Sequence, residues 1–157
     1  MIIPLDYKEL LRILNRHRVK YLIVGAYAVI HYTEPRYTKD LDIWVEPEKK
    51  NAQRVYAALK EFGAPLKDIN IDDFVNPALV YQIGVEPVRI DIMTGIAAMD
   101  FGVVYKHRKV ASFDGIKVGI MGINELVEAK RKTKRPMDAI DVAALRLCYR
   151  LKRSKKI

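Results

Sequence analysis

The chain has 157 residues, of which half are hydrophobic and 30% are charged, as is usual for a globular protein. It lacks the ~18 consecutive apolar residues of a membrane-spanning helix and the basic and apolar regions of a secretory signal. Its single cysteine, Cys148, excludes an intramolecular disulfide and favours a cytoplasmic location. The net charge of +9 favours polyanionic partners. We therefore expect residues 1–157 to form a single domain with no membrane partner.

Apolar periodicity and turn residues divide the chain into helices and strands. In chain order, the pattern predicts a helix over 6–17, a strand over 20–24, a helix that opens near Gly25, a strand over 40–45, a helix over 48–62 that ends at Gly63, a loop over 64–79, strands over 79–85 and 88–93, a hairpin over 108–120 that turns at Asp114-Gly115, and helices over 123–133 and 137–151. Asp6 is the expected N-cap of the first helix, and Pro136 separates the last two helices. This order predicts an α/β (α+β) fold with a mixed β-sheet flanked by helices and with two closing C-terminal helices.

Two acidic residues lie one residue apart at the start of the strand over 40–45. Side chains alternate between the faces of a strand, so Asp40 and Asp42 point the same way. Carboxylates so placed repel each other unless a cation or strong donors lie between them, and oxygen ligands of this kind suit Mg²⁺. The alternative is a solvated strand edge or turn, where such pairs are common.

A third acid, Asp91, interrupts the apolar strand over 88–93. Asp is rare inside strands, and a lone buried charge is unfavourable without a partner. If this strand lies beside the Asp40–Asp42 strand, the three carboxylates converge and can hold two divalent ions ~4 Å apart, the spacing used in phosphoryl transfer. An ion pair of Asp91 with Arg36 or Arg89 is the alternative.

In combination, these residues resemble the nucleotidyltransferase superfamily with the DNA polymerase β-like fold, and in particular its small prokaryotic AbiEii-type and minimal members. The resemblance covers roughly residues 18–145. It rests on the segments Gly25-Ala26-x-Ala28, Arg36-x-Thr38-x-Asp40-x-Asp42, Asp91, Leu126-x-x-x-Lys130 and Arg135-x-x-Asp138-x-x-Asp141.

The resemblance implies a metal-dependent enzyme that transfers an NMP from an NTP to a hydroxyl of RNA, such as a tRNA end, or of a protein. It also implies a possible role with a cognate toxin or antitoxin protein. Two Mg²⁺ or Mn²⁺ ions are expected on Asp40, Asp42 and Asp91, and Asp91 is expected to help deprotonate the acceptor. The implied nucleotide-binding residues are Gly25, Ala26, Arg36, Thr38 and Lys130.

Ala26 departs from the family pattern, which usually has Ser or Gly at this position. A serine hydroxyl there would contact phosphate, whereas the backbone N–H groups at a helix start bind an anion whatever the side chain. Because of this departure, the alternative function is a non-catalytic nucleotidyltransferase-like module that binds nucleotide or RNA. A weaker alternative is a structural RNA-binding protein.

Several other residues have two interpretations each. Trp44 shares the face of Asp40 and Asp42, where packing is favoured over stacking on a base. Arg36 either contacts phosphate and orients Asp40 or forms a structural ion pair, and Lys130 is either a triphosphate ligand or a surface lysine.

The basic residues of the C-terminal part form two blocks. The block over 130–135 is expected to line the site or meet RNA, and the tail over 152–157 is expected to be a frayed end. Asp138 and Asp141 are predicted to pair with Arg135 and Lys134 along one helix.

Overall fold

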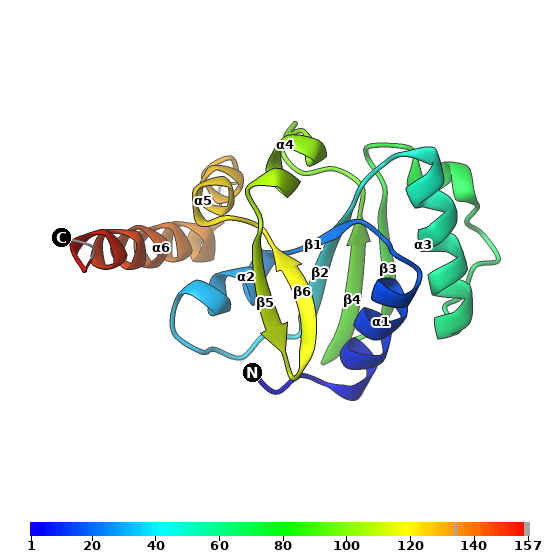
Figure 1. Ribbon diagram of the computed structural model, residues 1–157, viewed down its shortest axis with the longest axis horizontal. Coiled ribbons are helices and arrows are strands. Elements are labelled where there is room, and N and C mark those ends of the chain that lie inside the picture. The colour runs from blue at the N-terminus through cyan, green and yellow to red at the C-terminus, as the bar shows by residue number, and fades with distance from the viewer. Residues whose placement is uncertain (134, 156–157) are drawn as a thin grey trace.

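A computed structural model describes residues 1–133 and 135–155, which form a mixed sheet and the helices packed against it (Figure 1). The helices are α1 (Leu5–Arg16), α2 (Gly25–Tyr32), α3 (Lys49–Phe62), the 3-10 helix η1 (Ile71–Phe74), α4 (Phe101–Lys106), α5 (Ile123–Arg131) and α6 (Pro136–Ser154). The strands are β1 (Tyr21–Val24), β2 (Asp40–Val45), β3 (Val80–Val85), β4 (Val88–Met93), β5 (Lys109–Phe113) and β6 (Ile116–Ile120). These elements confirm the predicted mixed α/β plan with two closing helices.

The sheet has six strands in the order β3-β4-β2-β1-β6-β5. Its two parallel pairs are β2 with β4 and β1 with β6, and the hairpins β3–β4 and β5–β6 are antiparallel, as is the pair β1–β2. The central strand β1 is buried along its whole length, which explains its uninterrupted apolar sequence. This order places β2 between β1 and β4, so the strand with the paired aspartates lies in the middle of the sheet.

The helices pack in groups around the sheet. α1 packs against α3, α5 packs against α6, and α2 contacts both the central strands and the closing helices. In Figure 1, α6 projects away from the sheet, with α5 beside its N-terminal part. α2 therefore links the middle of the sheet to the pair α5–α6, and this corner of the fold contains the candidate site.

Most predicted elements are found within a few residues of their expected bounds. The exceptions are local. α4 was not predicted, and η1 lies inside the segment expected to be a loop. α1 begins at Leu5 after Pro4, so that Asp6 lies in the first turn of the helix and is not its N-cap.

The C-terminal tail also differs from its prediction. α6 continues to Ser154, so residues 152–154 of the predicted tail are helical rather than frayed. Lys152 and Arg153 lie in its last turn, where positive charge interacts favourably with the helix dipole. Residues 156–157 of the predicted tail and Lys134 lie outside the described residues.

Within the described parts of the chain, no helix is both long enough and apolar enough to cross a bilayer.

Candidate active site

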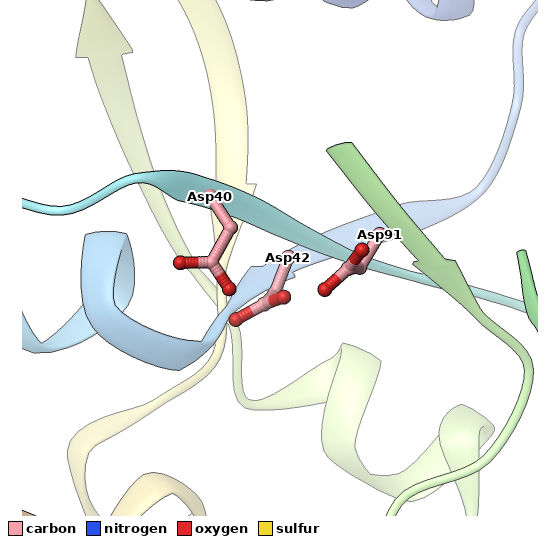
Figure 2. Close-up of side chains that lie close together, drawn as sticks. All are labelled: Asp40, Asp42 and Asp91. Carbon is pink, nitrogen blue, oxygen red and sulfur yellow. The ribbon is translucent and has the colours of Figure 1, made fainter. Parts of the chain in front are cut away.

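Strand pairing brings the three aspartates together (Figure 2). β2 and β4 are parallel, and their register sets Asp42 beside Asp91 and Asp40 beside Arg89. Residues paired across neighbouring strands point to the same face, so all three carboxylates project from one side of the sheet. One oxygen from each of them lies within 4.8 Å of the others. The predicted convergence of Asp40, Asp42 and Asp91 is therefore present in the structure.

A glycine allows Asp42 to lie close to the start of α2. Gly25 has a left-handed backbone with φ of +64°, and a Cβ atom placed on it would lie 2.1 Å from Oδ2 of Asp42. No side chain other than hydrogen fits in that space, and L residues are also strained at this φ. The chain therefore needs glycine here both to turn from β1 into α2 and to admit the carboxylate.

The carboxylate cluster has an unfavourable charge distribution without a cation. Burial, together with the charges of Asp40 and Asp91, raises the pKa of Asp42 to about 7, against an opposing effect of the positive charge of Lys130. Among the described residues, Oδ1 of Asp91 is a buried oxygen with no hydrogen-bond partner. An orphaned buried oxygen next to two further carboxylates is an arrangement that a divalent cation would satisfy.

Arg89 partly neutralises the cluster. Its Nη2 atom lies 3.3 Å from Oδ2 of Asp40 and 3.2 Å from Oδ2 of Asp91. The ion pair considered as an alternative for Asp91 therefore exists together with the carboxylate cluster, and its partner is Arg89 rather than Arg36.

Two hydroxyl groups support the strand ends that carry the cluster. Thr38 lies 3.4 Å from Oδ1 of Asp40, to which its hydroxyl donates. The hydroxyl of Tyr7, on α1, donates to the carbonyls of Lys39 and Arg89 at 3.2 and 3.0 Å and so ties together the ends of β2 and β4. Tyr7 was not identified from the sequence, where it has the pattern of an ordinary buried residue of an amphipathic helix.

A cavity of about 400 Å³ opens in front of Asp40 and Asp42. Its walls come from the β1–α2 junction, the α2–β2 loop, β2, β4 and the helices α5 and α6. The lining residues that were predicted as site residues are Gly25, Ala26, Arg36, Thr38, Asp40, Asp42 and Lys130. Thr133, Arg135, Asp138 and Asp141 also line the cavity, so part of the basic block over 130–135, including Lys130 and Arg135, lines it.

Three described cations line this cavity, and two of them, Arg36 and Lys130, are paired with acids of α6. The two terminal guanidinium nitrogens of Arg36, Nη1 and Nη2, contact the carboxylate of Asp141 at 2.5 and 3.3 Å. Nζ of Lys130 lies 3.0 Å from both Asp138 and Asp141. With a side chain 14% exposed, Lys130 is not the surface lysine of the alternative interpretation.

Of the two interpretations of Arg36, the ion pair is present: Arg36 pairs with Asp141, and no ion pair of Arg36 with Asp40 is found among the described residues. The predicted ion pair with Arg135 is not found among the described residues: Asp138 and Asp141 both pair with Lys130, and Asp141 also pairs with Arg36. The proposed partner Lys134 lies outside the described residues.

Two further features concern the nucleotide-binding prediction. α2 begins at Gly25 with no side-chain cap, so its first backbone N–H groups, including that of Ala26, face the cavity without a side-chain acceptor.

Trp44 is 1% exposed and packs edge-on against Phe101 of α4, which confirms the packing interpretation over stacking on a base.

A larger cavity, about 790 Å³, lies on the other side of the α2–β2 loop and shares Arg36 and Thr38 with the first. Its described lining contains no carboxylate and is mostly apolar, with Tyr27, His31, Tyr37 and Phe113 as its aromatic residues. The smaller cavity is lined by Asp40 and Asp42 and by three cationic side chains, so we place the candidate chemistry there although its volume is smaller.

Comparison with solved structures supports the fold. The lincosamide antibiotic adenylyltransferase LnuA, solved with lincomycin bound, matches with a TM-score of 0.61 and 15% identity over 92% of this chain and 97% of its own. A proposed nucleotidyltransferase from Thermotoga maritima, TM1012, matches with a TM-score of 0.60 and 16% identity over 91% and 93%. The antibiotic-resistance factor ANT(2'')-Ia matches with a TM-score of 0.59 and 14% identity over 96% and 92%.

No protein-family model matches the sequence, and no curated protein matches it significantly. Because the sequence identities are 14–16%, the solved structures show the fold alone, and this fold is that of the nucleotidyltransferases.

Proposed function

We propose that the protein is a metal-dependent nucleotidyltransferase that moves an NMP from an NTP to an acceptor hydroxyl. One observation carries this proposal: three carboxylates converge on one face of two parallel strands. Two of them, Asp40 and Asp42, line a cavity that also contains cationic side chains and an uncapped helix start. The nucleotidyltransferase fold of the chain supports it. The placement in the AbiEii-type or minimal group stays part of the proposal.

The carboxylates have the role of metal ligands. Asp40, Asp42 and Asp91 would hold Mg²⁺ or Mn²⁺, and two such ions would neutralise charge on the phosphates and activate the acceptor oxygen. Asp42 must lose its proton to act as a ligand, and a pKa of about 7 makes this possible near neutral pH. Asp91 would accept the proton of the acceptor hydroxyl, a role that its oxygen without a hydrogen-bond partner supports.

The nucleotide would occupy the cavity in front of the aspartates. The backbone N–H groups of Gly25 and Ala26 would bind phosphate oxygens, with the helix dipole adding to the attraction. Arg36 and Lys130 would neutralise the triphosphate, and Thr38 would keep Asp40 oriented. The acceptor oxygen then attacks the α-phosphorus, the bond to the bridging oxygen breaks and pyrophosphate leaves. Positioning and charge neutralisation supply most of the rate in such reactions.

The acceptor follows less directly from the site. The net charge of +9 supports RNA, such as a tRNA end, and a protein hydroxyl is the second choice. A cognate toxin or antitoxin protein is part of the same proposal. Because LnuA is an adenylyltransferase for an antibiotic, small hydroxyl compounds are a third class to include in the test.

A non-catalytic nucleotide-binding module is the second candidate. Ala26 supplies no hydroxyl to a phosphate, and Arg89 already contacts Asp40 and Asp91, where a metal ion would have to compete. Such a module would bind Mg²⁺-NTP without forming any labelled product.

The test is to incubate the protein with Mg²⁺ and each α-³²P-labelled NTP together with total RNA, cell protein or a small-molecule extract. Label in one fraction, absent with the Asp91→Asn variant, would support the enzyme and identify its acceptor class. Nucleotide binding without label in any fraction would favour the non-catalytic module.

A further inference from the structure

The closing helix α6 makes few buried contacts with the rest of the protein, and two of them are charged. Its buried residues are Asp138, Asp141 and Leu145, although the helix runs from Pro136 to Ser154. Buried acids are unfavourable unless they are paired, and helices usually dock through apolar residues. The two aspartates therefore require an explanation beyond the attachment of the helix.

Asp141 lies at the centre of this arrangement. Its side chain is 2% exposed, and its two oxygens contact Arg36 at 2.5 and 3.3 Å. The same carboxylate lies 3.0 Å from Nζ of Lys130. Asp138 contacts Lys130 from the other side and accepts a hydrogen bond from Thr133. One residue of α6 thus joins two cations that come from different parts of the chain.

Neither cation is held firmly by its own element. Arg36 lies in the irregular segment between α2 and β2, and its side chain is 30% exposed. Lys130 lies in the last turn of α5, a helix whose one buried residue is Leu126. Long cationic side chains lose rotamer entropy when they are fixed, so an oriented pair of cations needs a partner that fixes them. Asp141 is that partner for both.

We infer that Asp141 is a positioning residue, which orients Arg36 and Lys130 for a polyphosphate in the cavity of about 400 Å³. This inference rests on the proposed function for the identity of the ligand. Asp138 contacts Lys130, whereas Asp141 contacts both Lys130 and Arg36, so we expect Asp138 to contribute less to the orientation of the two cations. The nucleotide site is therefore incomplete without α6, the helix that projects from the fold (Figure 1).

Two simpler roles make opposite predictions. If Asp141 acted only through its charge, its removal would raise the positive potential of the cavity and tighten the binding of an anion. If it served only to attach α6, its removal would lower stability and leave the affinity of the folded protein unchanged. A positioning role alone predicts weaker binding by a protein that is still folded.

The experiment is calorimetric titration with inorganic tripolyphosphate and Mg²⁺, a probe that carries neither base nor sugar and needs no turnover. We expect the affinity of the Asp141→Asn variant to fall about tenfold or more, comparable with the loss of one or two charge-assisted hydrogen bonds. The Asp138→Asn variant should lose less. The matched control is Glu128→Gln on α5. It breaks an exposed ion pair with Lys132, and this variant should bind tripolyphosphate as the wild type does.

Unchanged or tighter binding by folded Asp141→Asn protein would overturn the inference, as would a wild type that binds no tripolyphosphate. If circular dichroism shows that Asp141→Asn does not fold, Asp138→Asn decides: weaker binding supports the inference and unchanged binding overturns it. Weaker binding by Asp141→Asn in a protein that labels no acceptor would support the positioning role while the proposed function fails.

Discussion

The contact between Gly25 and Asp42 allows a sharp test, because the chain contains a matched glycine elsewhere. Gly25 and Gly63 both have left-handed backbones, with φ of +64° and +89°. A Cβ atom at Gly25 would lie 2.1 Å from Oδ2 of Asp42, whereas a Cβ atom at Gly63 would meet nothing within 4 Å. The variants Gly25→Ala and Gly63→Ala therefore share the backbone strain, and only the first adds a collision with the carboxylate cluster.

The expected magnitudes follow from this difference. Alanine in the left-handed region costs about 1–2 kcal/mol, so both variants should lose this much free energy of unfolding. Contacts of a Cβ atom under 3.0 Å essentially never occur, so Asp42 must also move by roughly 0.9 Å or adopt another rotamer in the Gly25→Ala variant. A displacement of about 1 Å can lower a rate about 100-fold, which is the loss of transferase activity that we expect for this variant alone.

Chemical denaturation and the labelled-NTP assay measure the two effects separately. Gly63→Ala should keep its activity despite its loss of stability. Full activity in Gly25→Ala, or an equal loss of activity in both variants, would refute the reasoning that this glycine exists to admit Asp42.

Four further predictions concern pH, metal binding, stability and phosphate binding. The pKa of Asp42 is raised from 3.8 to about 7, so its protonated form stabilises the fold below pH 4, and this stabilisation is lost as pH rises through 7. Without Mg²⁺, denaturation should show a loss of at most about 4 kcal/mol in the free energy of unfolding between pH 4 and 8. An equally steep pH profile for Asp42→Asn would contradict this cause. Mg²⁺ should raise the melting temperature more at pH 8 than at pH 6, because its ligands are then ionised, and a shift independent of pH would count against these aspartates as ligands. Tyr7→Phe should lower the free energy of unfolding by about 1–2 kcal/mol, since the carbonyls of Lys39 and Arg89 lose their donor, and an unchanged denaturation midpoint would show that those bonds are unimportant. Ala26→Ser should strengthen tripolyphosphate binding by supplying the missing hydroxyl, and weaker binding would mean that phosphate does not approach this helix start.

The sequence was sufficient for most of the fold because its local signals agree with each other. Alternation along β2 placed Asp40 and Asp42 on one face, and Asp114-Gly115 marked the β5–β6 hairpin, where Asp114 and Gly115 both have positive φ. α4 was missed because it is only six residues long, from Phe101 to Lys106. Its signal was present in Asp100, whose side chain accepts a hydrogen bond from the N–H of Val103.

The partners within the site were less predictable, because they depend on contacts between distant segments. The convergence of Asp91 with Asp42 requires that β2 and β4 pair in parallel and in register, which no local pattern specifies. Arg36 and Asp141 are separated by 105 residues, so a prediction based on charges nearby in the sequence could not identify this pair. Tyr7 gave no signal at all, since its hydroxyl acts on backbone carbonyls of other elements.

The most direct measurement for the central claim is anomalous diffraction from crystals grown with Mn²⁺ and an NTP analogue whose α,β bridging oxygen is replaced by CH₂. We predict anomalous peaks between the carboxylates of Asp40, Asp42 and Asp91, with the triphosphate extending from them to the start of α2 and to Lys130 and Arg36. Ordered nucleotide elsewhere in the protein, or Mn²⁺ bound without any contact to these aspartates, would contradict the account.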